Sequence, residues 1–240
     1  MKYFLFLFVG LAASNGTLAQ HRDIDSLKAL LTKASTEAEI KILLELCWGY
    51  RFVNADSARE FGLRALADAK EAKLESLEAE ALNYIGATHE AQGDYAEALK
   101  YELNALELRR KIGDDNETAK TINNIGIIYD EKGDYQKALE YYFEVRRIFE
   151  RMQNPANIAM VISNIGIVLK AQKEYRKVVH IYHEALTIYK KINNRFGVGA
   201  CDANLGSVYF FLKEYDSSLY YSLKSTKEFE EQNRKQLLAM

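Results

Sequence analysis

The sequence predicts an all-α protein, a superhelical solenoid of about five antiparallel helix pairs, and three observations support this prediction. First, a similar segment recurs every forty residues, with a glycine at the same place in each copy: Gly86, Gly126, Gly166 and Gly206. Second, apolar residues around these glycines are spaced by three and four positions, which is the period of an α-helix. Third, the 240 residues include one proline, 48% apolar and 28% charged residues, a composition typical of a helix-rich globular chain.

Each forty-residue unit is expected to hold two helices joined by a short break. The first helix should extend from about six residues before the glycine to about six after it, and Ile122 and Ile125 belong to its apolar side in the third unit. In the segment "EKGDY", Gly133 supplies the backbone freedom of a helix C-terminus, and Asp134 is placed to cap the next helix. That second helix should run over residues 135–152.

Small residues are expected where the two helices of a pair cross. Gly126 and Ala138 should face each other, since their lack of side-chain bulk lets two backbones approach closely. Tyr129 and Tyr142 should fill the space beyond them. Ala98 holds the position of Ala138 in the preceding unit. Because neither helix can bury its apolar side alone, stacked units should share one continuous core.

This pattern resembles the tetratricopeptide-repeat (TPR) family over residues 37–232. The family calls for small and large residues at set places, which in the third unit are held by Gly126, Tyr129, Ala138, Tyr142 and Val145. Two features depart from the family pattern. The unit here has forty residues instead of about 34 and lacks the family's proline near its end, which implies longer helices or longer connections. In the last full unit, Ser222 replaces the aromatic residue.

The predicted organisation has a leader, a lead-in segment and five units. The boundaries are 1–20 for a signal peptide, 21–36 for the lead-in, 37–232 for the solenoid and 233–240 for the start of an incomplete next helix. Within the solenoid, the units are expected at about 39–78, 79–118, 119–158, 159–198 and 199–232. The first unit matches only in its second half, as is common for terminal repeats.

The first twenty residues have the layout of a secretory signal peptide. Lys2 precedes an apolar stretch from Phe4 to Ala13, and small and polar residues follow, so cleavage is expected after Ala19 or Gln20. The apolar stretch is well short of the roughly 20 residues that a membrane-spanning helix needs. We therefore expect an exported protein, periplasmic or secreted if the source is bacterial, with no stable membrane insertion after cleavage.

The first helices carry candidate ligand-binding amides. Asn124, Asn164 and Asn204 stand two places before their glycines, and Asn83 is close to this position in the second unit. Because an amide donates and accepts at once, a ladder of amides can hold the main chain of an extended peptide without reading its side chains. The resemblance to the TPR family implies the same role, since some members hold peptide backbones with asparagines here. The alternative is that each amide serves neighbouring backbone groups between stacked helices.

A second set of candidates follows the glycines by one helical turn: Glu90, Asp130, Glu131, Lys170 and Phe210. If these side chains face the same concave groove, the groove is acidic at one end and aromatic at the other. Such a groove would suit a partner segment with basic and apolar residues. The alternative is an ordinary solvated surface near helix ends. The lysine and asparagine set by which some TPR proteins clamp a C-terminal carboxylate is not evident in this sequence.

Motifs for catalysis or metal binding are not evident either. The sequence contains no phosphate-binding loop, nucleophile elbow or zinc-protease motif, so we expect neither an enzyme nor a cofactor. His180 and His183 are close in sequence, but they belong to a second helix and are expected to bind no metal. Cys47 and Cys201 lie four units apart, too far for a disulfide, and should be buried as small apolar residues.

Two functional hypotheses remain. The net charge of −2 lacks the basic surplus that nucleic-acid binding requires, so the partner should be a protein or peptide. The leading hypothesis is a non-enzymatic scaffold that binds such a segment in its groove. The second is a sensory input module of a bacterial signal-transduction protein, a sensor kinase or regulator, of which this chain would be one part. Since no capping helix is evident after the last unit, self-association through the C-terminal end is also expected.

Overall fold

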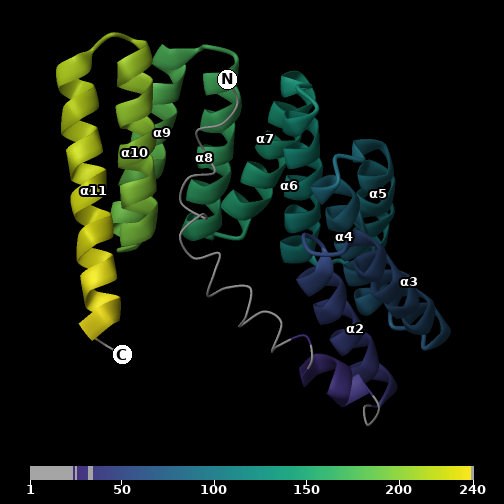
Figure 1. Cartoon of the computed structure of the whole chain (residues 1–240). Helices are drawn as coiled ribbons and strands as arrows, with labels where there is room; N and C mark the ends of the chain where they lie inside the picture. Colours follow the sequence, from purple (N-terminus) through teal and green to yellow (C-terminus); the bar gives the residue numbers. More distant parts are fainter. Residues whose placement is uncertain (1–23, 25, 32–34, 239–240) are drawn as a thin grey trace. The chain divides into compact units, whose positions relative to one another are not determined.

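The computed structural model describes residues 24, 26–31 and 35–238, with side chains as far as Glu231. Every element with defined bounds in this part is an α-helix: α2 (Thr36–Tyr50), α3 (Ala55–Glu71), α4 (Glu75–Ala91), α5 (Tyr95–Ile112), α6 (Asp115–Glu131), α7 (Tyr135–Arg151), α8 (Pro155–Ala171), α9 (Tyr175–Lys191), α10 (Arg195–Phe211) and α11 (Tyr215–Leu238). The all-α prediction is thereby confirmed for the described residues (Figure 1). The predicted signal peptide lies outside them.

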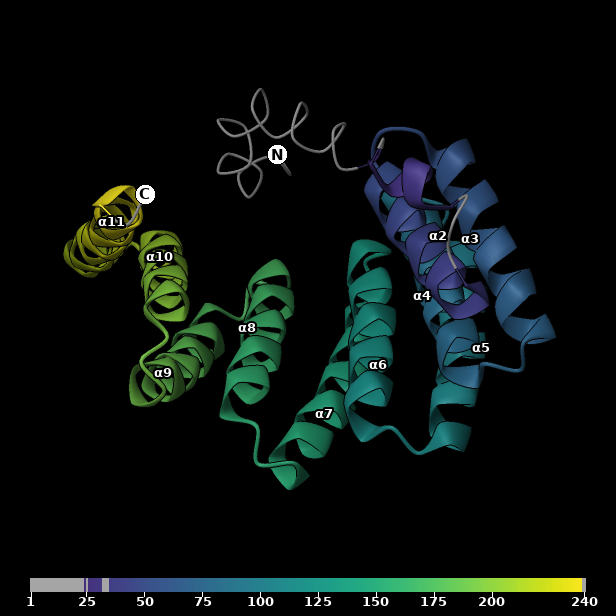
Figure 2. The same cartoon turned by 90° about the horizontal axis from the view of Figure 1, so that it is seen from below.

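The chain forms two compact units, unit 1 up to Asp114 and unit 2 from Asp115. Unit 1 contains the helix pairs α2/α3 and α4/α5, and unit 2 contains α6/α7, α8/α9 and α10/α11. Inside each unit, every helix packs against the helices that precede and follow it in the chain. Figures 1 and 2 show, for example, α8 between α7 and α9. This arrangement of stacked antiparallel pairs confirms the predicted fold class.

Tight turns recur every twenty residues and set the length of the repeat. One residue in each turn has a positive φ angle, between 52° and 81°: Lys73, Gly93, Gly113, Gly133, Gln153, Lys173, Asn193 and Lys213. The helices between these turns are mostly 17 residues long. The predicted cap is confirmed, because the Asp134 carboxylate accepts a hydrogen bond from the backbone N–H of Lys137 at 3.3 Å. The forty-residue unit therefore consists of long helices and short turns.

The observed unit boundaries differ from the predicted ones. Residues 78 and 79, expected to separate two units, both lie inside α4, and the later boundaries fall inside α6, α8 and α10 in the same way. The prediction counted from glycines in the middle of the first helices, whereas the turns at the helix ends separate the units. Pro155, the one proline of the sequence, is the first residue of α8, a position that favours proline.

The C-terminal segment also differs from its prediction. α11 continues without a break to Leu238, so residues 233–238 extend this helix instead of starting another. Asn233 stands forty residues after Asn193, which forms the equivalent turn one unit earlier. The local sequence therefore does not decide between a turn and a continued helix here.

We expect Lys173→Gly to raise the free energy of unfolding by about 0.5 to 1 kcal/mol. Lys173 has φ of 64° at the turn position that glycine holds in Gly93 and Gly133, and a side chain disfavours this conformation. Urea unfolding followed by circular dichroism measures the change. The control is Lys177→Gly in the first turn of α9, where the backbone is helical, and it should lower stability by up to about 1 kcal/mol. A loss of stability in Lys173→Gly would contradict the explanation.

Two of the repeat glycines lie against aromatic rings of the paired helix. A Cβ atom added to Gly126 would be 2.7 Å from Cε1 of Tyr142, and one added to Gly166 would be 2.8 Å from Cζ of Tyr182. The three atoms nearest to such a Cβ at Gly126 all belong to Tyr142, a contact that was not predicted. Gly126 must therefore be small because the Tyr142 ring lies closest to it.

The ring of Tyr129 has a partner that was not predicted. It stacks on Tyr141, with centroids 5.5 Å apart and planes 9° apart. Equivalent stacked rings join the two helices in two other helix pairs: His89 with Tyr101, and Tyr209 with Tyr221. The signal was present in the sequence, since these rings stand three and fifteen residues after each glycine.

The pair α10/α11 replaces part of the apolar core by serines. Ser222 stands where the other pairs in unit 2 have a tyrosine, and a Cβ on Gly206 would be 2.6 Å from its Oγ and 3.2 Å from its backbone nitrogen. The two helices therefore approach closely. Ser218 donates a hydrogen bond across the pair to the carbonyl oxygen of Gly206 at 2.8 Å. Polar contacts and a close approach of the two helices thus replace the aromatic packing of the other pairs in unit 2.

A buried charge lies in the same helix pair. Asp202 is fully buried at the position that Ile122 and Ile162 hold in the two preceding units. Lys224 of α11 donates from Nζ to Oδ1 of Asp202 at 3.2 Å and lies 3.1 Å from Oδ2. This ion pair was not predicted, because the two residues are 22 positions apart and neither recurs at the forty-residue period.

Both cysteines are free and buried, as predicted. Burial raises the pKa of the Cys47 thiol to about 11 and that of the Cys201 thiol to about 12. Both thiols are therefore neutral at physiological pH and serve as small packing groups.

Candidate functional site

The predicted amides lie on the first helices, but their contacts differ. Asn124, Asn164 and Asn204 are all half-buried. Asn164 donates from Nδ2 to Oδ1 of Asn123 on α6 at 3.0 Å, so it joins two neighbouring first helices. Asn123 was not predicted, although it precedes Asn124 directly. This hydrogen bond joins two side chains of stacked helices, whereas the alternative role considered for these amides was a bond to backbone groups.

Asn83, in unit 1, has a partner within its own helix pair. It donates from Nδ2 to Oε2 of Glu102 on α5 at 2.6 Å. Glu102 is fully buried and holds the position of Tyr142, so the second unit has a carboxylate where the family pattern calls for an aromatic ring. A buried carboxylate needs hydrogen-bond donors, and the amide of Asn83 supplies one.

Helical geometry groups Asp130, Lys170 and Phe210 on one side of the first helices of unit 2, whereas the predicted amides Asn124, Asn164 and Asn204 are turned away from that side by about 100°. Residues seven apart lie on the same side of an α-helix, so Asn123 and Asp130 share one side of α6, with Ile127 between them. The equivalent positions on the other two helices form the same pattern. We call this set the first-helix face: Asn123, Ile127 and Asp130 on α6; Ser163, Ile167 and Lys170 on α8; Ala203, Ser207 and Phe210 on α10.

Two half-buried charges distinguish this face. Asp130 and Lys170 hold equivalent positions on α6 and α8, and neither forms an ion pair with another described residue. Burial and then the neighbouring Glu131 raise the pKa of Asp130, while burial lowers the pKa of Lys170. Both groups are thus charged in surroundings that disfavour the charge, which is more typical of functional sites than of ordinary surfaces.

Of the remaining predicted residues, only Phe210 belongs to the first-helix face. Phe210 is 59% exposed and contacts the rings of Phe211 and Tyr215, with centroids 6.1 and 5.9 Å away. Glu131 is exposed beside Asp130. Glu90 is half-buried on α4 of unit 1 and so is not part of the first-helix face.

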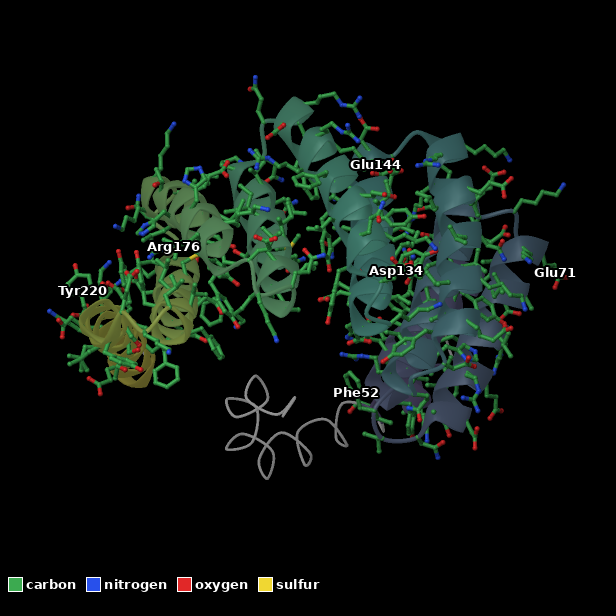
Figure 3. All side chains as sticks on the ribbon, turned by 90° about the horizontal axis from the view of Figure 1, so that it is seen from above. Phe52, Glu71, Asp134, Glu144, Arg176 and Tyr220 are labelled. Carbon is green, nitrogen blue, oxygen red and sulfur yellow. The ribbon has the colours of Figure 1, made fainter. Side chains whose placement is uncertain are left out.

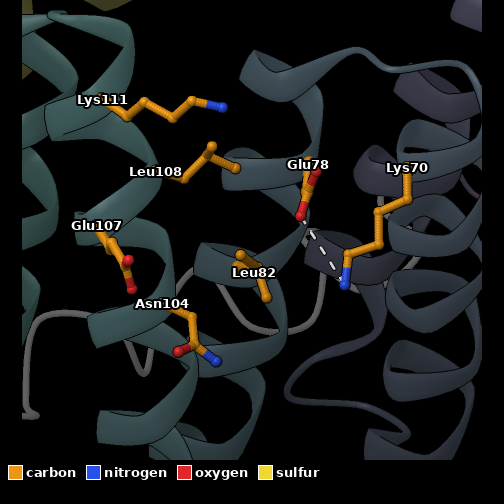
Figure 4. Close-up of a pocket in the computed structure, with 7 residues that line it drawn as sticks. All are labelled: Lys70, Glu78, Leu82, Asn104, Glu107, Leu108 and Lys111. Carbon is orange, nitrogen blue, oxygen red and sulfur yellow. Dashed lines mark ion pairs between the residues drawn. The ribbon is translucent and has the colours of Figure 1, made fainter.

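Unit 1 contains a hollow of about 450 Å³ between α3, α4 and α5 (Figure 4). It is lined by Lys70, Glu78, Leu82, Asn104, Glu107, Leu108 and Lys111. Lys70 lies 3.8 Å from Glu78, and Lys111 pairs with Glu75, so both lysines already have acidic partners. Because these charges are compensated, the hollow is a weaker candidate than the first-helix face.

Unit 2 contains a more apolar hollow, of about 590 Å³, between α7, α8 and α9. It is lined by Leu139, Phe143, Ile165, Leu169, Arg176, Lys177, His180 and Ile181. Arg176, labelled in Figure 3, pairs with Glu214 at 2.8 Å. His183 is directed elsewhere, since its ring contacts Tyr221 edge-on with centroids 5.8 Å apart.

The described residues offer neither a metal site nor a membrane-spanning helix. They contain no group of three His, Cys, Asp or Glu side chains that could hold a metal ion. None of their helices combines the length and the apolar character that crossing a bilayer requires.

Comparison with known families agrees with the helix pairs and their repeat. Two family models described as tetratricopeptide repeats match residues 77–151 and 158–196. The chain belongs to the TPR family. Residues 77–151 cover α5, α6 and α7 with most of α4, and residues 158–196 cover most of α8 and all of α9. No curated protein matches the sequence of this TPR chain.

Solved structures share the fold at low sequence identity. BtubC from P. vanneervenii has a TM-score of 0.74 and 17% identity, over 90% of each chain. A signal transduction ATPase from Pyrococcus horikoshii, described with a tetratricopeptide repeat sensor, has a TM-score of 0.74 and 18% identity, over 85% of this chain and 32% of its own. A Rap protein complexed with competence and sporulation factor has a TM-score of 0.68 and 14% identity, over 91% and 72%. At these identities the likeness shows the fold alone.

Proposed function

We propose that this TPR chain is a non-enzymatic interaction scaffold whose first-helix face binds an extended segment of a partner protein or peptide. The observation that carries the proposal is the pair Asp130 and Lys170, two half-buried charges without ion-pair partners among the described residues. A ligand with a cation near Asp130 and an anion near Lys170 would supply the missing partners. Such charge-assisted hydrogen bonds are about twice as strong as neutral ones.

Asn123 of the face, the neighbouring Asn164 and the apolar residues of the face support the same mode of binding. Asn123 and Asn164 are already bonded to each other, yet an amide has further donor and acceptor positions that can reach a peptide main chain. Ile127 and Ile167 are half-buried between the polar positions and offer apolar contact. The solved Rap protein complexed with a factor adds support that this fold accommodates a partner.

The proposal is tested by selecting ligands from a phage-displayed library of random peptides on the mature protein. We expect enriched peptides to combine basic, acidic and apolar residues. Isothermal titration of the enriched peptides against Asp130→Asn and Lys170→Met should show affinity losses of about tenfold each, since hydrogen bonds to charged groups contribute about 1.5 kcal/mol. Asn104→Ala, at the hollow of unit 1, is the matched control and should leave affinity unchanged.

Two results would overturn the proposal. One is a library selection that enriches no peptide on the folded protein. The other is enriched peptides whose affinity is retained in Asp130→Asn, in Lys170→Met and in an Asn124/Asn164/Asn204→Ala triple variant. Binding that is instead lost in Phe143→Ala would assign the site to the apolar hollow of unit 2.

Lys170→Met should also raise stability at neutral pH while it weakens binding. Burial lowers the pKa of Lys170, so the folded state carries a penalty for the charge below that lowered pKa. The penalty shrinks as pH rises toward the ordinary pKa of lysine, because the amine then loses its proton. Urea unfolding at neutral and at alkaline pH should therefore show a gain for Lys170→Met only at neutral pH. A loss of stability at neutral pH would show that the lysine is structural.

A sensory input module is the second candidate function. It is supported by the solved ATPase described with a tetratricopeptide repeat sensor, of whose length this chain spans about a third. Hydrogen exchange with an enriched peptide separates the two functions. A scaffold should gain protection only in the first helices, whereas a sensor should also change exchange in helices without ligand contact.

We further propose that the protein is exported after removal of residues 1–20. The basis is the layout of that segment, with one basic residue, a short apolar stretch and small residues before Gln20. N-terminal sequencing of protein purified from the periplasm of an expressing bacterium should begin at Gln20 or His21. Product that keeps Met1 and stays in the cytoplasm would refute export.

A further inference from the structure

We propose that two copies of this chain associate through α11, with the two helices antiparallel about a two-fold axis. The contact surface is the α11 stripe, which consists of Tyr215, Leu219, Tyr220 and Leu223. Each of these side chains is 60 or 61% exposed, and their spacing of four, five and eight residues places them on one side of the helix. Figure 3 shows Tyr220 projecting from α11. Adjacent exposed apolar side chains of this kind mark interaction surfaces.

The equivalent side of α9 shows what packs against such a stripe. Tyr175, forty residues before the first stripe residue, stacks on Phe211 of α10 with ring centroids 5.2 Å apart. His183, forty residues before the last stripe residue, contacts the ring of Tyr221 of α11. This side of α9 is therefore the interface to the next helix pair. The α11 stripe is the same interface, and no described helix covers it.

Two charged residues indicate that the partner is a second copy. Asp216 and Lys227 are eleven residues apart, which is three helical turns, so they lie on the same side of α11 and flank the central stripe residues. Both are exposed, and neither forms an ion pair with a described residue. In an antiparallel pair, Asp216 of each copy lies opposite Lys227 of the other. Two-fold symmetry forms this ion pair twice, so the same surface supplies both the acidic and the basic partner.

The stripe is separate from the proposed ligand site. The first-helix face lies on α6, α8 and α10, whereas the stripe belongs to the second helix of the last pair. An experiment that overturns one of the two proposals therefore leaves the other untouched. Variants of α11 leave Asp130 and Lys170 unchanged.

Sedimentation velocity at increasing protein concentration tests the association. We expect a monomer–dimer equilibrium that a Leu219→Glu/Leu223→Glu variant weakens at least a hundredfold, since central apolar residues dominate interface energies. Asp216→Lys or Lys227→Asp alone should weaken the dimer about tenfold, because each creates two repulsive contacts. The double variant Asp216→Lys/Lys227→Asp should return the dissociation constant to within about threefold of the original, because it restores both ion pairs.

The matched control is Leu103→Glu, which places the same charge on an exposed leucine of α5 in unit 1 and should leave the dimer intact. Circular dichroism checks that each variant keeps its helices. A protein that stays monomeric at all concentrations, or a dimer indifferent to Leu219→Glu/Leu223→Glu, would overturn the proposal. A double charge reversal that fails to restore the dimer would overturn the antiparallel arrangement.

Discussion

Lys224→Met is expected to lower the free energy of unfolding by about 3 kcal/mol, because it leaves a buried carboxylate without its cation. Asp202 is fully buried, and the Lys224 ammonium is the charged group within 3.2 Å of its oxygens. Methionine keeps most of the length of the lysine side chain, so packing is largely retained. Urea unfolding of the variant at neutral pH measures the loss.

The control removes both charges. Asp202→Ile/Lys224→Met should recover most of the lost stability, since isoleucine occupies this core position in Ile122 and Ile162. Replacement of a buried ion pair by apolar residues is often neutral or stabilising. A single variant that loses less than about 1 kcal/mol would show that water reaches Asp202, in conflict with its burial.

Gly126→Leu is expected to lower the free energy of unfolding by about 2 kcal/mol through overpacking. Even a Cβ atom at this place would be 2.7 Å from the Tyr142 ring, which is itself 98% buried and cannot swing into solvent. The helices of the pair must then move apart and lose contact along their length. Thermal and urea unfolding both report the change.

A double-mutant comparison separates the contact from helix propensity. Gly126→Ala alone should be destabilising, because its methyl group meets Tyr142. In a Tyr142→Ala background the ring is absent, so the same change should stabilise by about 1 kcal/mol, the usual gain of alanine over glycine in a helix. If Gly126→Ala has the same sign in both backgrounds, the ring is not the reason for the glycine.

The candidate site was predictable only in part. Asn164, Asp130 and Lys170 stood out because they recur at fixed distances from the glycines, and all three lie on first helices of unit 2. The role of Asn123 was not visible, because its hydrogen bond to Asn164 depends on the approach of α6 to α8. Glu102 was missed for the same reason, since a glutamate on a helix is usually on the surface.

The sequence by itself determined the repeat length, the all-α class and the small residues at the helix crossings. These features come from local patterns. Periodic apolar residues make a helix amphipathic, and a left-handed turn ends the helix each time the turn recurs along the chain. These local patterns do not depend on which residues pack against each helix.

Only the tertiary structure decided which side chains meet. It placed the Tyr142 ring against Gly126, and it paired Asp202 with Lys224 in a core position. It also decided that α11 continues through the position where the preceding helix turns. The physical reason is that these outcomes depend on how closely two helices approach and at what angle they cross. That geometry is set by all contacts of the pair together and is not present in any short stretch of sequence.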